Sequence, residues 1–266
     1  MKKFFEIVNN IWKIEELRSR ILVTLGLLLV YRFGAQVVLP GIDTSQLAEL
    51  SSNTEQGILG ILNAFTGGAF ANASVFALGI MPYISASIVV QLMGIAIPYL
   101  QKLDKEGESG RKTKTQITRW LTIAICIVQA PAYLYSLGAL GVPDSAFLLG
   151  KGLNFIVPSV IILVTGCVFA MWLGEKITDK GIGNGISLLI MIGIIATLPQ
   201  AFVQESASRL NGNGGPMLIL VEVILWFAVI LASVLLVMAV RRIPVQYARR
   251  TASGGYEKNV MGSRQY

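Results

Sequence analysis

The sequence predicts an all-α membrane protein with six membrane-spanning helices and one broken, re-entrant segment before the second span. Apolar residues make up 54% of the 266 residues and charged residues only 14%, whereas a soluble domain carries about 25% charged residues. The apolar residues form runs of about 20, the length of a transmembrane helix, and they do not alternate as barrel strands do. Basic residues gather in alternate connections, which is typical of a multi-pass topology.

The six spans are taken from these apolar runs. They are expected at roughly 21–40, 74–97, 119–140, 154–173, 184–203 and 216–240, within a membrane domain over 21–240. Basic residues number five in 1–20, six in 102–119, two in 174–183 and six in 241–266, which is 19 of 22. Because basic loops stay on the cytoplasmic side, both ends of this chain are expected in the cytoplasm.

The two ends of the chain are polar and basic. Residues 1–20 have mixed charge and no apolar core followed by a cleavage site, so they are expected to form a cytoplasmic amphipathic segment, either solvated or lying on the membrane surface. Residues 241–266 form a basic loop. Its charge either serves only to orient the chain in the membrane, or it also binds an acidic partner or RNA phosphate. Since the sequence stops inside this loop, we expect a longer native protein.

The stretch from Gly57 to Pro98 is apolar and uncharged, yet a Gly-Gly pair, two asparagines and a proline interrupt it. Lipid tolerates broken backbone only where protein or a water-filled cavity covers it. The lead-in at 57–72 is too short to cross a bilayer, because a crossing takes about 20 residues. This segment is therefore expected to line a pathway.

The motif LGIMPYISAS, which begins at Leu78, carries an aliphatic pair. Ile80 and Ile84 lie four residues apart and share a helix face. Pro82 removes a helical hydrogen bond and can kink the helix. Ordinary helix packing explains the small and polar residues of this motif equally well.

A second aliphatic pair follows a glycine-rich turn in WLGEKITDKGIGNGIS. The preceding helix is expected to end near Trp172, and Asn184 is a good N-cap for the next helix. Ile186 and Ile190 again lie four residues apart. Neither this turn nor GESGRKT at 107–113 has the spacing or the strand–helix context of a nucleotide loop, so no ATP site is expected.

Few residues are available for catalysis. The chain has no histidine, which removes the commonest proton shuttle and metal ligand. Cys126 and Cys167 lie in apolar runs and are expected to be small buried hydrophobes. No catalytic residue, metal site or cofactor is therefore expected. Arg32 and Glu222 are the two charges within spans; Arg32 either reaches outward or pairs within the helix bundle.

A protein-conducting channel is the main hypothesis, and a transporter, a membrane protease and a scaffold are its alternatives. A protein-conducting channel needs a broken segment and an uncharged constriction. A small-solute transporter with broken helices needs intramembrane ionisable groups for coupling. A membrane protease needs a nucleophile and a base, and this chain has no histidine to serve as the usual base. A scaffold needs neither group.

Several collinear motifs resemble the SecY family, which forms the pore of the bacterial protein-conducting channel. They are VYRFGAQVVLPGID, FTGGAF, LGIMPYISAS, KEGESGRKT and WLGEKITDKGIGNGIS. The resemblance covers about 15–266 and implies the first half of a ten-helix translocon channel. It implies that unfolded polypeptides cross the membrane through the pore and that apolar segments leave it sideways into lipid.

The family pattern assigns expected roles to particular residues. The pore ring is Ile80, Ile84, Ile186 and Ile190; the plug includes Leu59, Phe65, Gly67, Gly68 and Asn72; the lateral gate includes Ser85, Gln91 and Gln129; and the docking residues are Arg241, Arg242, Arg249 and Arg250. The implied partners are the SecE and SecG subunits, the SecA ATPase, the ribosome, and preproteins with signal peptides. The implied location is the bacterial inner membrane.

Overall fold

The computed structural model describes most of the chain. The described residues are 12–44, 47, 58–139, 142–148, 150, 152–210, 215–240, 249–250 and 256–257. The chain divides into two units, Met1–Ala201 and Phe202–Tyr266, and each is described by itself. Residues 1–11 of the expected N-terminal segment lie outside the described residues.

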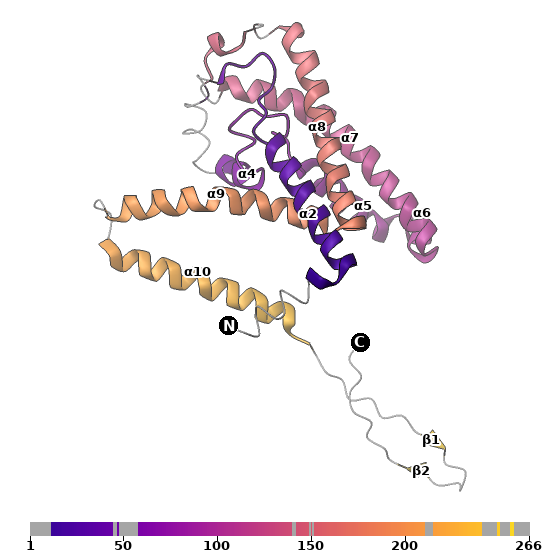
Figure 1. Ribbon diagram of the computed structural model, residues 1–266. Helices are drawn as coiled ribbons and strands as arrows, with labels where there is room; N and C mark the ends of the chain where they lie inside the picture. The colour runs from indigo at the N-terminus through magenta and orange to yellow at the C-terminus, as the bar shows by residue number, and fades with distance from the viewer. Residues whose placement is uncertain are drawn as a thin grey trace. The chain divides into compact units, whose positions relative to one another are not determined.

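The first unit begins with helix α2, Glu15–Gly34 (Figure 1). Two glutamates in its first turn suit the positive end of the helix dipole, so the helix begins at Glu15 rather than at 21. It also ends before the expected residue 40. The chain then turns, and Val38 forms an isolated antiparallel bridge with Ser74.

The broken segment contains helix α4, Ile58–Phe65, followed by consecutive turns up to residue 80. Gly67 and Gly68 have φ values of 65° and 87°, which glycine adopts without strain. Helix α5 covers Met81–Ala96. Pro82 starts this helix instead of kinking it, because it lies in the first turn of α5, where its missing N–H costs no hydrogen bond.

Helices α5 and α6 form a bent pair. Helix α6, Pro98–Lys105, is turned by 98° from α5, and Pro98 starts it. After Gly107, with a φ of 68°, helix α7 runs over Glu108–Ala139. The expected start at 119 is therefore too late, because the charged residues before it are good helix formers and extend the helix.

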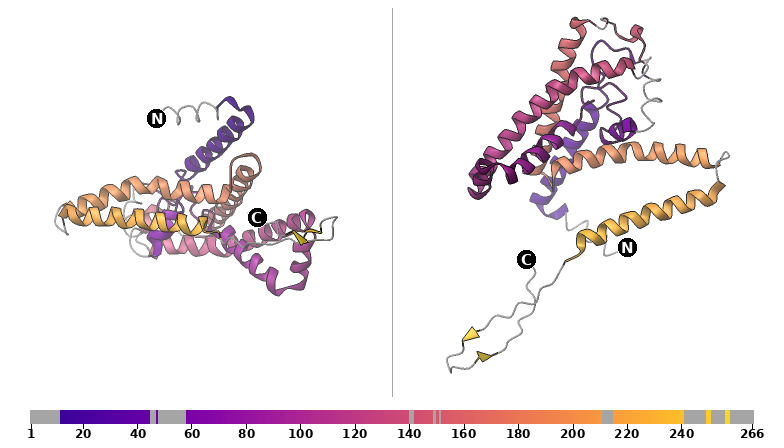
Figure 2. Two further views of the ribbon diagram at one scale, coloured as in Figure 1. Left: turned by 90° about the horizontal axis from the view of Figure 1, so that it is seen from below. Right: turned by 180° about the vertical axis from the view of Figure 1, so that it is seen from behind.

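A single 3-10 turn, η2 at Asp144–Ala146, leads towards helix α8, Leu153–Lys180. The expected end near Trp172 is wrong. Leu173 and Ile177 lie four residues apart and are both buried, so packing extends the helix to Lys180. Helices α7 and α8 lie side by side (Figures 1 and 2).

Helix α9, Gly185–Leu210, begins in the first unit and ends in the second. Asn184 Oδ1 accepts hydrogen bonds from the backbone N–H groups of Ile186 and Ser187, at 3.1 and 3.2 Å. The predicted N-cap is thus confirmed. The second unit continues with helix α10, Gly215–Met238, and with a short antiparallel pair of strands, β1 at Arg249–Arg250 and β2 at Tyr256–Glu257.

Apart from this short strand pair and two isolated bridges, the regular structure of the described residues is helical, as expected for an all-α membrane protein. Within the described part, four helices are long and apolar enough to cross a membrane: α7, α8, α9 and α10. The bent pair α5–α6 makes a fifth candidate.

Two apolar clusters hold the first unit together, and the turn at 66–80 contributes to both. Phe70 belongs to the first cluster, where the Tyr133 hydroxyl donates to its carbonyl at 2.9 Å. Phe76 belongs to the second cluster and stacks on Tyr31, with ring centroids 5.4 Å apart. The irregular segment is therefore held by packing on both sides, which is what non-helical backbone needs at membrane depth.

Candidate functional site

Of the four isoleucines of the expected ring, Ile84 lies in α5 and Ile186 and Ile190 lie in α9. Ile80 is the N-cap residue just before α5. Ile80 is 4% exposed and belongs to the second apolar cluster, and Ile84 and Ile186 pack against that cluster. Ile84, Ile186 and Ile190 also line one cavity of about 560 Å³. The structure therefore brings three of the four residues into one cluster and joins the fourth to them through the cavity wall.

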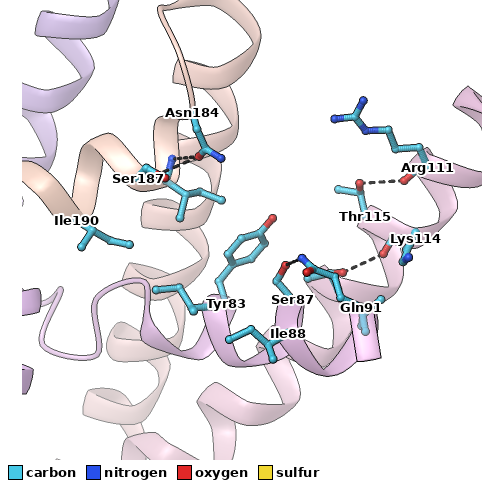
Figure 3. Close-up of a pocket in the computed structure, with 14 residues that line it drawn as sticks. Tyr83, Ser87, Ile88, Gln91, Arg111, Lys114, Thr115, Asn184, Ser187 and Ile190 are labelled. Atoms are coloured by element: carbon cyan, nitrogen blue, oxygen red, sulfur yellow. Dashed lines mark hydrogen bonds between the residues drawn. The ribbon is translucent and has the colours of Figure 1, made fainter. Parts of the chain in front are cut away.

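The cavity between α5, α7 and α9 is mixed in character (Figure 3). Tyr83, Ser87 and Gln91 come from α5, Thr115 from α7, and Ser187 from α9. A second cavity of about 830 Å³ shares part of this wall and extends to Glu175 on α8. The polar walls can hold water next to the aliphatic residues, which cannot hydrogen-bond with it.

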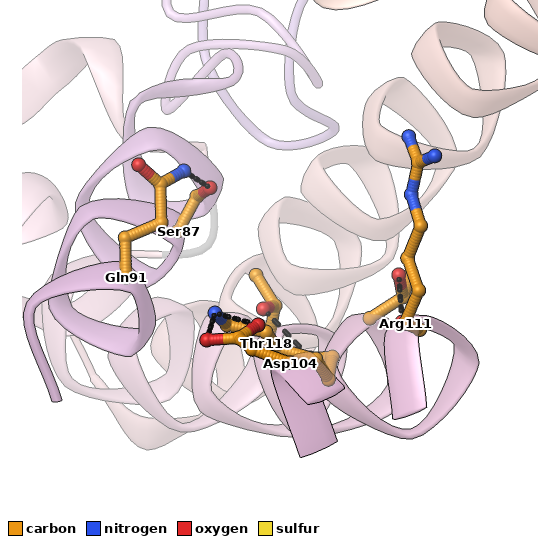
Figure 4. A network of polar contacts seen from close by, with 7 residues as sticks. Ser87, Gln91, Asp104, Arg111 and Thr118 are labelled. Carbon is orange, nitrogen blue, oxygen red and sulfur yellow. Dashed lines mark hydrogen bonds and ion pairs between the residues drawn. The ribbon is translucent and has the colours of Figure 1, made fainter. Parts of the chain in front are cut away.

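Charged residues of α7 line these cavities, and most of them are paired. Lys114 Nζ lies 2.8 and 3.1 Å from the carboxylate oxygens of Asp104 on α6 (Figure 4). Lys112 lies 3.3 Å from Glu108, with both side chains exposed. The Arg119 guanidinium binds Glu175. The sequence pattern did not single out these pairs, because their partners lie on other helices or in a stretch expected to be a loop.

The expected plug residues lie in α4 and in the turn after it. Leu59 is in α4, although its side chain lies outside the described part, and Phe65 ends this helix at 37% exposure. Gly67 and Gly68 form the turn, and the Asn72 N–H donates to the Gly68 carbonyl at 3.1 Å. The role of this segment as a plug stays a prediction.

Arg32 has a partner in this turn. Its Nη1 donates to the Gly67 carbonyl at 2.5 Å, and the contact is partly buried. The guanidinium therefore pairs within the helix bundle, which was one of its two expected positions. The acceptor is a backbone carbonyl, which no sequence pattern marks.

Of the expected lateral-gate residues, only Gln91 is among the residues that line the smaller cavity. Gln91 lines the smaller cavity and donates to Ser87 Oγ at 3.1 Å. Ser85 on α5 and Gln129 on α7 are exposed. Their role in a gate stays a prediction.

The expected docking arginines lie in the second unit. Arg249 and Arg250 form β1 and pair in register with Glu257 and Tyr256. Arg241 and Arg242 lie outside the described residues.

Comparison with known proteins points to one family. The family model for SecY matches residues 74–265. The chain is 44% identical over 237 residues to protein translocase subunit SecY of Haemophilus influenzae, and 42% identical over 240 residues to that of Escherichia coli K12. Each match covers 88% of this chain and 53% of the relative, so the chain spans about half the length of the curated relatives that it matches.

A solved structure has a similar fold. It is described as a protein conducting channel, with a TM-score of 0.55 and 19% sequence identity over 93% of this chain and 52% of that chain. The helices and the broken segment define a multi-pass helical membrane protein. The sequence matches identify its family: the chain belongs to the SecY family. The resemblance read from the motifs is thereby confirmed.

Proposed function

We propose that this chain forms part of a protein-conducting channel, through which unfolded secretory polypeptides cross the membrane. The observation that carries the proposal is the convergence of Ile80, Ile84 and Ile186 in one cluster, beside a cavity that Ile190 also lines. Relatives named protein translocase subunit SecY support it.

The chemistry of these side chains suits a passive pore. A constriction without charge or hydrogen-bonding groups holds water poorly, so it resists ions while it is narrow. It also makes no strong bond to a polypeptide that has to leave again. The polar cavity next to it can hydrate an arriving chain until that chain enters the constriction. A channel of this kind needs no catalytic group or cofactor of its own.

The finer features of the proposal follow the sequence and the family. Six spans with both ends in the cytoplasm agree with the distribution of basic residues, in the inner membrane of a bacterium. Transmembrane segments of clients would leave through a lateral gate that includes Ser85, Gln91 and Gln129. SecE and SecG would complete the channel, and SecA or the ribosome would drive the client from the cytoplasmic side.

Polar substitution of the ring tests the proposal. In reconstituted channels, I84N and I186N should each raise the resting ion conductance about tenfold, because an amide retains water in the constriction. I161N is the matched control: Ile161 lies on α8 and is 60% exposed, away from the ring. Unchanged conductance in both ring variants, with normal insertion of the protein, would reject the ring.

A further inference from the structure

The Arg32 side chain is a charged group in an otherwise apolar part of α2. An arginine at this depth is costly unless it finds a partner. Its Nη1 donates to the carbonyl of Gly67, 35 positions further along the chain. A charged donor makes a stronger hydrogen bond than a neutral one does, especially away from water. Helix α2 is thus tied to the turn that follows the expected plug helix.

Gly67 is held from a second side by α9. A Cβ atom placed on Gly67 would lie 2.8 Å from Gly193 Cα and 3.1 Å from Arg32 Nη1. A Cβ atom placed on Gly193 would lie 2.9 Å from the Phe65 carbonyl and 3.2 Å from the Gly67 nitrogen. The backbone of the turn therefore touches the backbone of the helix, and a side chain at either position would collide with it.

The contact on α9 lies on the face that carries the pore residues. Ile186, Ile190 and Gly193 follow one another at spacings of four and three, so they lie along one side of the helix. Gly193 lies about two turns beyond Ile186. A movement of α9 that shifts the isoleucines therefore also shifts the surface on which the turn at Gly67 rests.

We propose that Arg32 is a positioning residue that holds the plug in its resting place, with Gly193 as the seat on α9. The proposal rests on the channel function proposed above. Arg32 binds the plug from α2, and Gly193 meets the same turn from the pore-lining helix. Opening requires that the hydrogen bond from Arg32 breaks and that the Gly67 turn leaves Gly193. The contact thus sets the resting equilibrium between a seated and a displaced plug.

Substitution of Arg32 tests the hydrogen bond. In the assembled channel, R32M should raise resting ion conductance about tenfold, since one charge-assisted hydrogen bond shifts a two-state equilibrium by at least that factor. R32K keeps a charged donor and should recover part of the effect. If R32M raises conductance only in proportion to a loss of thermal stability, and R32K does not recover it, Arg32 is merely structural.

Plug position can be read without ion flow. A cysteine is introduced by F65C, with Cys126 and Cys167 replaced by alanine, and its reaction with a water-soluble thiol reagent is timed. R32M should speed this reaction about tenfold. If R32M speeds labelling but the protein shows neither conductance nor translocation, the contact between Arg32 and the plug is supported and the channel function is rejected. Unchanged labelling in R32M would overturn the contact itself.

Gly193 provides a second test that does not depend on removing a charge. G193A should strengthen α9 as an isolated helix, yet its methyl group would meet the Phe65 carbonyl, so the plug should be displaced and labelling should rise several-fold. G26A is the matched control, because a Cβ atom on Gly26 of α2 would meet nothing within 4 Å. Equal labelling rates in G193A and G26A would overturn the seat.

Discussion

The Arg119 guanidinium on α7 donates two hydrogen bonds to the Glu175 carboxylate on α8. Nε lies 2.9 Å from Oε1 and Nη2 lies 2.6 Å from Oε2. The Glu175 side chain is 18% exposed and that of Arg119 is 39% exposed. This two-pronged geometry fixes both orientation and distance, so it joins two neighbouring helices at the wall of the larger cavity.

Removal of this ion pair should loosen the contact between α7 and α8. R119A and E175A should each lower the free energy of unfolding by about 1 kcal/mol, a modest value because water reaches the arginine. The double variant should lose less than the sum, as measured by thermal unfolding in detergent. K112A is the control, since Lys112 and Glu108 are 79% and 85% exposed. Strict additivity of the two losses would show that the pair contributes no coupling.

The N-cap of α9 gives a second prediction. N184A removes the oxygen that accepts from the Ile186 and Ser187 amides, so the free energy of unfolding should fall by about 1 kcal/mol. Hydrogen exchange at those two amides should accelerate. N184D keeps an acceptor and should behave like the native protein. Equal exchange in N184A and the native chain would mean that the cap carries no free energy.

The basic loop gives a third prediction. Reversal of charge in R249E/R250E should weaken binding to ribosomes and lower its dependence on salt, because fewer counterions are released from RNA phosphate. Binding is measured by co-sedimentation over a range of salt concentrations. K102E/K105E is the control for overall charge, since both lysines lie on α6, far from this loop in the sequence. Equal affinity at low salt would reject the docking role.

The sequence correctly predicted the all-helical class and those features that depend on only a few neighbouring residues. Runs of about 20 apolar residues mark helices directly, and Asn184 marks a helix start because its side chain acts within two or three residues. Helix ends were less predictable. A proline such as Pro82 either kinks a helix or lies in its first turn. Only the structure decides between the two, because it shows that α5 begins at Met81. The buried Leu173 and Ile177 extend α8 by tertiary packing, which no local pattern reports.

Of the expected site, the sequence predicted only those features that follow from the spacing of residues along one helix. The four isoleucines were found because residues four apart share a helix face. The contact between Gly67 and Gly193 has no such signal, since it joins two backbones that lie 126 positions apart in the sequence. The sequence marks Arg32 as a charge within a span, but its acceptor is a backbone carbonyl, a group that every residue possesses. Long-range backbone contacts of this kind require coordinates.

Helix α10 has a practical consequence for these measurements. None of the apolar window Met217–Met238 is buried within the described part of the chain, and Leu236 and Val237 are 78% and 82% exposed. In buffer without detergent or lipid, so large an exposed apolar surface would cause the protein to aggregate. The protein is therefore always measured as a complex with detergent or lipid. The length of the hydrocarbon tail of that amphiphile becomes an experimental variable alongside each substitution.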